Sequence, residues 1–433
     1  MNQTYINLLA AFISYKSIST DLSYKTEIQK TVAWLKNTFD MQNFTTQIIE
    51  GYDNPIVVAK YIANPSYKTC LIYGHYDVQP ADITDGWDSE PFTLTQKNNR
   101  IFARGAIDNK GQIAIHIAAI FELIKENKLG HNITFMIEGN EETGSPFLSK
   151  FIQYYKQILD CDFIMISDGE ITAQSPVIEL GFRGGFNSTL NIQTASNDLH
   201  SGIYGGAAPS ASHELSKFLA SLFNEQNQVA IPHFYDNVEP IDGKMNIPFS
   251  QEEYSKITGA KALLTEPGID YYNQTGLRPT LQITGIQSGY VEDGYKNIIP
   301  CKATAKINAR LVKNQNPTKI AELLTQFIKD NLPSYVDHTF TITDPYEGIK
   351  LDVENEYVKK ATQLLEKAYN KKPLYKYSGG GLPVVTEFDA VLGKPQVLVP
   401  FANEDCAMHG ANENFDLKFA ERAYNFSKSY FSQ

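Results

Sequence analysis

A histidine and an aspartate stand two residues apart in the segment YGHYDVQP, which covers residues 73 to 80. Side chains two apart on an extended chain point the same way, so His75 and Asp77 share one face. They stand at the carboxyl end of the predicted strand TCLIYG, where open α/β sheets bind ligands. Taken alone, the pair is more typical of an ordinary hydrogen bond than of a site, because metal or catalytic use needs further converging groups.

Further acidic and imidazole side chains stand beside the other predicted strands and helices. Asp108 precedes a helix, Glu141 and Glu142 follow a strand, Asp168 follows the next strand, and His409 follows the last. Each has an ordinary explanation by itself, as an N-cap, a solvated pair, a turn former or a surface histidine. Because the carboxyl ends of parallel strands meet at one edge of a sheet, we expect these side chains to converge with the first pair.

Carboxylates and imidazoles without thiolates form a donor set that suits Zn²⁺, and also Mn²⁺ or Co²⁺. These side chains suffice for two ions. His75 and Asp168 can hold one ion, Glu142 and His409 can hold the other, and Asp108 can bridge them.

Two carboxylates are left over in this arrangement, and both have a use. Glu141 can act as a general base that takes a proton from an attacking water and hands it to the leaving nitrogen. Asp77 can accept a hydrogen bond from the non-ligating ring nitrogen of His75, which fixes its tautomer. The pattern therefore predicts metal-assisted hydrolysis of an amide bond.

The elements that must position these residues alternate between strands and helices. Two amphipathic helices are predicted at about residues 4 to 17 and 25 to 42, followed by two short strands. Helices at 112–127 and 147–159 then alternate with strands at 132–139 and 162–167, and the α/β character returns from about residue 350. This alternation predicts an α/β fold with a mostly parallel sheet covered by helices.

A different pattern begins near Gly181. Strands are predicted at 181–196, 281–289, 301–312 and 335–344, with helices at 210–223 and 318–332, which is the βαββαβ order of a ferredoxin-like α+β domain. The stretch from 225 to 278 is polar and is predicted to be an irregular excursion. We therefore expect a discontinuous catalytic domain of residues 1–180 and 346–433, with an inserted domain of residues 181–345.

Composition narrows the classes of partner. A chain of 433 residues exceeds the usual size of a single core, which favours two domains. Its formal charge of −11 argues against nucleic acid or an anionic membrane surface as the partner. The four cysteines form no C-x-x-C motif and are expected to be buried and reduced. No apolar run approaches the roughly 20 residues of a membrane span, and the N-terminus lacks signal-peptide features, so a cytoplasmic protein is expected.

The motifs GHYDVQP, DGWDSEPFTL, RGAIDNKGQ, EGNEETGS and DLHSGIYGG, with a late HG, occur in this order from about residue 70 to the C-terminus. In these motifs the chain resembles the di-zinc peptidase family that includes cytosolic nonspecific dipeptidase, carnosinase, glutamate carboxypeptidase and succinyl-diaminopimelate desuccinylase. It is most similar to the dipeptidase branch. The resemblance implies hydrolysis of dipeptides or short peptides, two Zn²⁺ per subunit, a homodimer formed through the inserted lid domain, and a cis peptide after Asp108.

The resemblance also implies roles for residues of the inserted domain. His200 in DLHSG corresponds to a lid histidine that reaches the site of the other subunit and stabilises the developing oxyanion. Asn297 and Arg310 match positions that hold the substrate, and the arginine acts as a fork for a carboxylate. Without the resemblance, His200 would be read as a surface histidine and Arg310 as an exposed strand residue.

The segment SGGGLPVVTEF has two explanations. Gly380 and Gly381 can expose backbone N–H groups ahead of Pro383 and so bind a substrate carboxylate, or the segment can be a plain flexible loop. The dipeptidase branch often carries serine where this chain has Gly381, and threonine where it has Asn297. Both departures concern substrate preference and leave the metal-binding residues unchanged.

Two other functions fit the same pattern. An N-acyl or N-succinyl amino acid deacylase would use the same site on another substrate. A non-catalytic binding protein on the same fold would be favoured by the loss of a metal ligand or of the base. The two histidines and five carboxylates named above are all present here.

Overall fold

The computed structural model describes residues 2–241, 245 and 247–433. The chain forms two compact units. Unit 1 consists of Met1–Leu180, Leu351–Lys376 and Pro383–Gln433, and unit 2 consists of Gly181–Lys350 and Tyr377–Leu382. Unit 2 takes in residues 346–350 and the segment Tyr377–Leu382. β15 (Ile349–Lys350) pairs with the last residues of β8 (Val177–Phe182), and the Arg183 N–H donates to the backbone oxygen of Ser378, the last residue of β16 (Leu374–Ser378).

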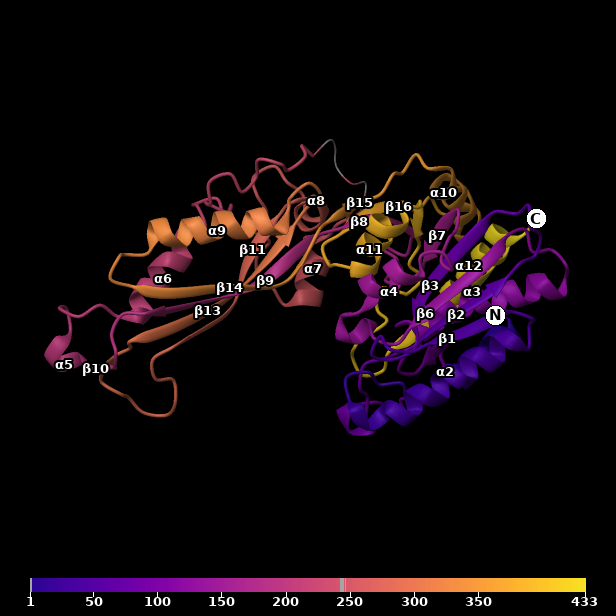
Figure 1. Cartoon of the computed structure of the whole chain (residues 1–433), viewed down its shortest axis with the longest axis horizontal. Coiled ribbons are helices and arrows are strands. Elements are labelled where there is room, and N and C mark those ends of the chain that lie inside the picture. Colours follow the sequence, from indigo (N-terminus) through magenta and orange to yellow (C-terminus); the bar gives the residue numbers. More distant parts are fainter. Residues whose placement is uncertain (1, 242–244, 246) are drawn as a thin grey trace. The chain divides into compact units, whose positions relative to one another are not determined.

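Unit 1 is built on a large sheet whose central strands are parallel, as the alternation of strands and helices predicts. Its order is β1 (Thr45–Ile49), β2 (Ile56–Tyr61), β6 (Asn132–Glu138), β3 (Thr69–His75), β7 (Phe163–Ile166), β17 (Gln396–Leu398) and β8. The pairs β6·β3, β3·β7 and β7·β17 are parallel, and the outer pairs are antiparallel. The strands β3, β6 and β7 lie side by side in Figure 1, and their carboxyl ends carry the candidate site residues.

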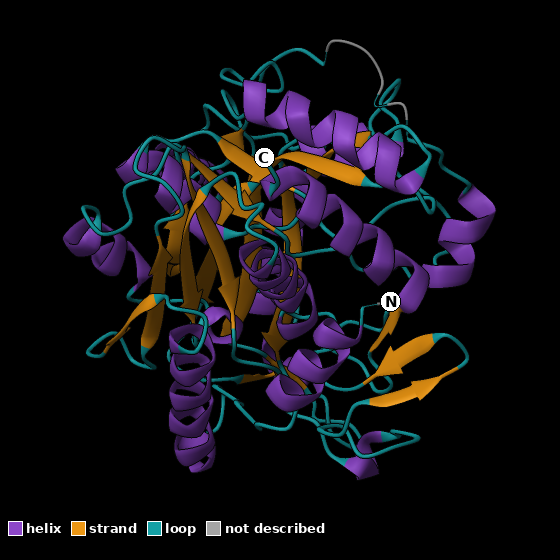
Figure 2. Ribbon diagram, turned by 90° about the vertical axis from the view of Figure 1, so that its right-hand side faces the viewer, coloured by secondary structure: helices purple, strands orange, loops and turns teal. Residues whose placement is uncertain are grey.

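Helices cover both faces of this sheet, which explains why the central strands are buried along almost their whole length. Gly74 of β3 lies directly against Ile113 of α3 (Lys110–Lys125), where a Cβ would come within 2.9 Å of Ile113 Cγ1. Tyr73 points to the opposite face and packs edge-on against Phe388 of α11 (Pro383–Leu392). Figure 2 shows the sheet of this unit among its helices. The remaining helices are α1 (Gln3–Ile13), α2 (Lys25–Asp40), α4 (Leu148–Tyr155), α10 (Glu356–Tyr369) and α12 (Leu417–Phe431).

Short elements shape the loops beside the site. Three 3₁₀ turns are η1 (Leu22–Tyr24), η2 (Ile83–Asp85) and η3 (Glu141–Thr143). A small sheet joins β4 (Thr95–Lys97), β5 (Arg100–Phe102) and β18 (Asn414–Asp416). It therefore connects the chain before Asp108 with the chain after His409.

Unit 2 has the predicted ferredoxin-like order. The strands β9 (Gly184–Gln193), β11 (Thr280–Ser288), β13 (Lys302–Leu311) and β14 (Asp337–Tyr346) form an antiparallel sheet in the order β11-β13-β9-β14. The helices α6 (Ala211–Ser221) and α9 (Pro317–Asn331) share one core with a single face of this sheet. The opposite face is polar, with cross-strand hydrogen bonds such as Asn308 to Asn187. A short extension carries β10 (Leu199–His200), α5 (Ser201–Tyr204) and β12 (Ile298–Ile299).

The stretch from 225 to 278 is less irregular than predicted, since it contains α7 (Gln251–Thr258) and α8 (Tyr271–Leu277). Part of it, residues 242–244 and 246, lies outside the described residues. The Asp270 side chain caps α8 by accepting from the Asn273 N–H, and Phe249 stacks on Tyr271 with ring centroids 4.6 Å apart. Local capping and aromatic contacts thus order a segment whose composition predicts a loop.

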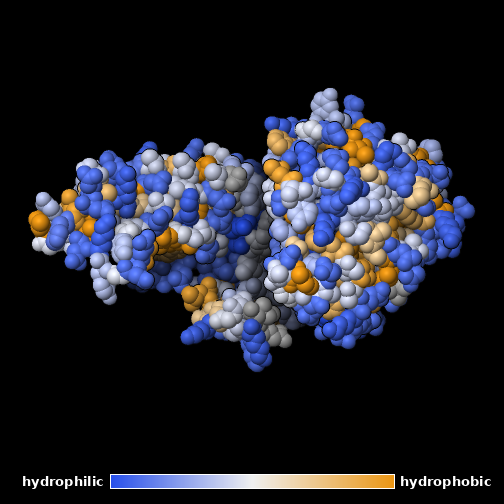
Figure 3. Space-filling view, turned by 90° about the horizontal axis from the view of Figure 1, so that it is seen from below, coloured by the Kyte–Doolittle hydropathy of each residue, from blue (hydrophilic) through white to orange (hydrophobic). Residues whose placement is uncertain are grey.

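The surface seen in Figure 3 mixes hydrophilic and hydrophobic residues on both units. Among the described residues, no helix combines the length and the apolar character needed to cross a membrane. All four cysteines are free and buried, which confirms the prediction for the thiols.

Candidate metal centre

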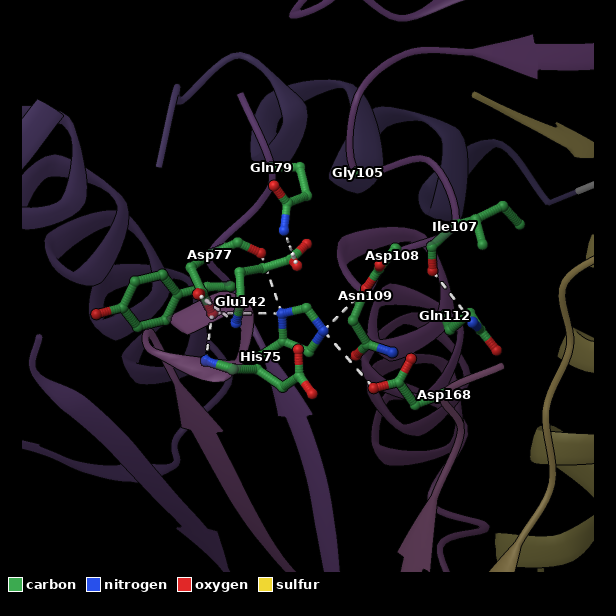
Figure 4. A network of polar contacts seen from close by, with 12 residues as sticks. His75, Asp77, Gln79, Gly105, Ile107, Asp108, Asn109, Gln112, Glu142 and Asp168 are labelled. Carbon is green, nitrogen blue, oxygen red and sulfur yellow. Dashed lines mark hydrogen bonds and ion pairs between the residues drawn. The ribbon is translucent and has the colours of Figure 1, made fainter. Parts of the chain in front are cut away.

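His75 ends β3 with one ring nitrogen anchored and the other facing two carboxylates. Its Nδ1 lies 3.0 Å from the backbone carbonyl oxygen of Asp77. Because a carbonyl only accepts, Nδ1 carries the hydrogen and Nε2 of the neutral ring presents a lone pair. Nε2 lies 3.0 Å from Asp108 Oδ1 and 3.6 Å from Asp168 Oδ2. Figure 4 shows the His75 ring facing these two aspartates. Within the described part of the chain, Nε2 has no hydrogen-bond partner. A buried, unpartnered nitrogen between two carboxylates suits a cation.

Asp108 lies between two imidazoles. It precedes a cis peptide bond to Asn109, as the resemblance implies. One carboxylate oxygen, Oδ1, faces His75 Nε2, and the other, Oδ2, lies 2.7 Å from His409 Nε2. This geometry is that of a carboxylate that can bridge two cations, one on each oxygen.

Two groups of donor atoms share Asp108. The first contains His75, Asp108 and Asp168, and the second contains Asp108, Glu142 and His409; within each group the donor atoms lie within 4.8 Å of one another. Glu142 Oε1 is also buried without a hydrogen-bond partner among the described residues. The donors are nitrogen and oxygen atoms without thiolates, so the residues present fit two divalent cations.

The charges of the site are strongly coupled. Burial opposes ionisation of Asp108, but the neighbouring imidazoles of His409 and His75 hold the pKa of its carboxyl below the ordinary value. Although burial disfavours the imidazolium, the surrounding carboxylates raise the pKa of His75 well above its usual value. Burial and neighbouring carboxylates raise the pKa of Glu141 to about 8 and that of Glu142 to about 7. More carboxylates than imidazoles therefore converge here, and bound cations would balance that excess of negative charge.

Asp77 holds the turn that carries the two glutamates. Its carboxylate accepts hydrogen bonds from the backbone N–H of Glu141 at 3.2 Å and of Glu142 at 3.0 Å, and from Ser19 Oγ at 2.7 Å. The sequence predicts that this carboxylate accepts from His75 Nδ1. In the structure the hydrogen bond of Nδ1 goes to the backbone oxygen of Asp77, and the carboxylate Oδ1 lies farther away, at 3.3 Å.

Glu141 lies beside both donor groups without belonging to either. Among the described residues, no side chain donates a hydrogen bond to its carboxylate or forms an ion pair with it. A half-buried carboxylate that is not used as a ligand is suited to accept a proton.

Glu413 is a buried residue of the site that sequence reasoning missed. Its Oε1 accepts from the backbone N–H of Ile107 at 2.8 Å and of Asp108 at 3.2 Å, and its Oε2 accepts from Gly105 N–H at 3.0 Å and from Arg104 Nη1 at 2.7 Å. Arg104 Nη2 also donates to the backbone oxygen of His409 at 3.2 Å. The only sequence signal is an acidic residue four positions after His409, which a solvated loop would also explain.

The other predicted residues lie in unit 2. His200 is exposed, and its Nδ1 accepts from the Gly202 N–H at 3.1 Å, which places the ring hydrogen on Nε2. Asn297 is beside it, since the Asn297 backbone oxygen accepts from Ser201 N–H. Arg310 Nη1 donates to Tyr346 Oη at 2.5 Å, and Gly381 lies against the same tyrosine. The structure thus places His200 beside Asn297. Separately, it places Arg310 beside the glycine segment that contains Gly380 and Gly381.

Comparison with known proteins connects this geometry to named relatives. The chain is 29% identical to "Cys-Gly metallodipeptidase DUG1" of Candida albicans, over 95% of this chain and 91% of that protein. It is 30% identical to the protein of the same name from Saccharomyces cerevisiae, over 84% of this chain and 78% of that protein. It is 28% identical to "Beta-Ala-His dipeptidase" of Homo sapiens, over 84% of this chain and 74% of that protein.

Solved structures agree with these matches. An M20 family metallo-carboxypeptidase, Sso-CP2 of Sulfolobus solfataricus, has a TM-score of 0.85 at 28% identity, covering 100% of this chain and 99% of that chain. The dipeptidase Dug1p of Saccharomyces cerevisiae has a TM-score of 0.79 at 25% identity, covering 99% and 95%. Residues 71–433 match the description "Peptidase family M20/M25/M40". The chain therefore belongs to this peptidase family and is a metallopeptidase.

Proposed function

We propose that this protein is a dipeptidase that hydrolyses the amide bond of dipeptides and other short peptides, with two Zn²⁺ in the candidate metal centre. The observation that carries the proposal is the position of Asp108, which is shared by two groups of donor atoms. The relatives named for Cys-Gly and β-Ala-His dipeptides support the substrate class.

The residues of unit 1 divide the work of binding and proton transfer. His75 and Asp168 would hold one ion, Glu142 and His409 the other, and Asp108 both. When bound, such ions polarise a scissile carbonyl and lower the pKa of a water.

Glu141 then accepts the proton of the attacking water and donates it to the leaving nitrogen, which restores the base for the next turnover. Asp77 keeps Glu141 and Glu142 in place through their backbone N–H groups.

A hydrolysis panel tests this function. The metal-loaded protein is assayed with a set of dipeptides and, in parallel, with N-acetyl and N-succinyl amino acids, while bound metal is measured by mass spectrometry. We expect turnover of dipeptides, and turnover of the N-acyl compounds alone would reject the proposal in favour of a deacylase. Glu141→Gln should retain its metal and lose activity by about 10³-fold or more, since only the base is removed. Glu404→Gln is the matched control, because Glu404 is an exposed carboxylate of unit 1.

We also propose that unit 1 is the catalytic domain and unit 2 a lid through which the protein forms a homodimer. The exposure of His200 and its free Nε2–H support a role as a donor to the oxyanion in the site of the other subunit. Mixing inactive Glu141→Gln with inactive His200→Ala should restore activity, because some heterodimers then have one complete site. Mixtures that stay inactive after proven subunit exchange would exclude the shared site. The four buried free thiols support a cytoplasmic location.

A further inference from the structure

Three strands of unit 2 place Arg310 and Tyr346 on either side of a glycine. Gly185 of β9 pairs with Arg310 of β13 on one side and with Tyr346 of β14 on the other. A Cβ on Gly185 would lie 2.1 Å from the Ala309 backbone oxygen, so no side chain separates the two neighbours. Arg310 Nη1 and Tyr346 Oη therefore meet across Gly185, at 2.5 Å.

Tyr346 also fills the space beside Gly381. A Cβ on Gly381 would come within 2.6 Å of Tyr346 Oη and 2.7 Å of its Cε2, distances that side chains do not tolerate. No side chain larger than hydrogen therefore fits at position 381 while Tyr346 is in place. The tyrosine hydroxyl lies where a side chain of residue 381 would begin.

Two arginine side chains carry positive charge beside Tyr346. Arg183 lies near Arg310, donating from Nε to the Gly379 backbone oxygen at 3.1 Å and from Nη1 to the Arg278 backbone oxygen at 3.1 Å. Burial, with the charge of Arg310, lowers the pKa of Arg183 to about 10. Within the described part of the chain, neither guanidinium forms an ion pair with a carboxylate. Both line a cavity of about 690 Å³ in this unit, so an anion can reach them.

The hydroxyl of Tyr346 has a hydrogen to donate. Its oxygen accepts from Arg310, and among the described residues nothing accepts the hydroxyl hydrogen. A carboxylate beside Arg310 would accept both that hydrogen and the remaining guanidinium N–H groups.

We infer that Tyr346 is a specificity-determining residue that orients Arg310 and donates its own hydrogen bond to the terminal carboxylate of a short peptide. This inference rests on the proposed function and specifies which group of this chain supplies the hydroxyl that residue 381 lacks. Tyr346 and the two arginines would select peptides with a free carboxylate over the same peptides ending in an amide, because an amide brings no charge to the two guanidiniums.

Tyr346→Phe tests the inference, since it removes the hydroxyl and keeps the ring. With alanyl-leucine we expect KM to rise about tenfold or more, as for the loss of a hydrogen bond to a charged group, while kcat changes less than about twofold. With alanyl-leucinamide KM should rise several-fold less, because the amide oxygen also accepts from the hydroxyl but forms a weaker hydrogen bond than a carboxylate. Tyr335 is a tyrosine of this unit that is 55% exposed, and Tyr335→Phe should leave KM unchanged for both substrates. An unchanged KM for alanyl-leucine, or an equal rise for both substrates, would overturn the inference.

A reciprocal exchange tests the space beside Gly381. Gly381→Ser should raise KM for alanyl-leucine in the natural chain, where it collides with Tyr346. In the Tyr346→Ala background the same substitution fits and should recover part of the lost affinity, because the serine hydroxyl returns a donor. Absence of any recovery, with both single variants folded, would contradict the proposed arrangement.

A binding measurement separates this inference from the proposed function. Calorimetry on the metal-loaded Glu141→Gln protein, with and without Tyr346→Phe, compares the affinities for alanyl-leucine and alanyl-leucinamide without turnover. If the wild-type chain hydrolyses no dipeptide, the proposed function fails. A loss of affinity that is several-fold larger for alanyl-leucine than for alanyl-leucinamide would still support Tyr346. Equal affinities in the two proteins would refute it.

Discussion

Glu413→Gln should destabilise unit 1 and loosen the metal centre together. The glutamate is completely buried, and each of its oxygens accepts two hydrogen bonds from Arg104, Gly105, Ile107 and Asp108. Glutamine keeps the shape but replaces one oxygen with an NH₂ group. In either orientation of the amide, that group faces two N–H donors, which are left without an acceptor.

The size of the effect follows from these contacts. An unsatisfied buried donor costs about 1–3 kcal/mol, and Arg104, only 3% exposed, loses the charge that it pairs with. Breaking a buried ion pair on one side costs about 3–5 kcal/mol. We therefore expect the free energy of unfolding to fall by about 3–5 kcal/mol. With a urea slope of about 3 kcal/mol/M, the midpoint would fall by about 1 M or more.

Tryptophan fluorescence reports on this unit alone, because both tryptophans of the chain, Trp34 and Trp87, belong to unit 1. The Trp87 ring also lies 5.4 Å from the Arg104 guanidinium carbon, so its emission responds directly to the lost pair. Glu404→Gln is the control, since this exposed glutamate also accepts two backbone N–H groups. Equal urea midpoints for the two variants would refute the reasoning, as would wild-type metal affinity in Glu413→Gln.

Three further substitutions test the site and its support. Glu142→Gln should weaken the binding of one of the two proposed ions, so that metal analysis after dialysis finds about half the metal of the wild type. Full retention of the metal would contradict the role of Glu142 as a ligand. Asp77→Asn should lower metal affinity by about 10- to 100-fold, the usual effect of losing a group that orients ligands, and a chelator competition that finds no difference would argue against it. Burial lowers the pKa of His116 to about 3. The unfolded chain therefore protonates this histidine near pH 6.5, while the folded chain keeps it neutral. Its contribution to the free energy of unfolding is lost as the pH falls from about 6.5 toward 3. Urea unfolding should therefore show that the wild type loses roughly 2 kcal/mol more than His116→Gln between pH 7.5 and 5; parallel pH curves would show that His116 does not titrate in this way.

The sequence was sufficient for the main architecture and for the two groups of donor residues that converge. Alternating strands and helices predict a mostly parallel sheet, and βαββαβ predicts the sheet of unit 2, because side-chain periodicity is a local property. Polar residues that end or follow parallel strands fall at one sheet edge, so topology brings His75 and Asp168 together. Asp108 joins them from the segment just before α3. The two helices in the 225–278 stretch were missed, since caps and aromatic stacking override a loop-like composition there.

Only the tertiary structure decided which atoms meet. Glu413 reaches the backbone of Asp108 from about three hundred residues away in sequence, and Tyr346 at the end of β14 fills the space beside Gly381. Asp77 supports the turn of Glu141 and leaves the His75 nitrogen to a backbone carbonyl. Most of these contacts join residues distant in sequence, and they depend on register, backbone direction and the absence of a side chain at a glycine. A linear pattern contains none of these quantities, because they arise only when the strands and loops pack in three dimensions.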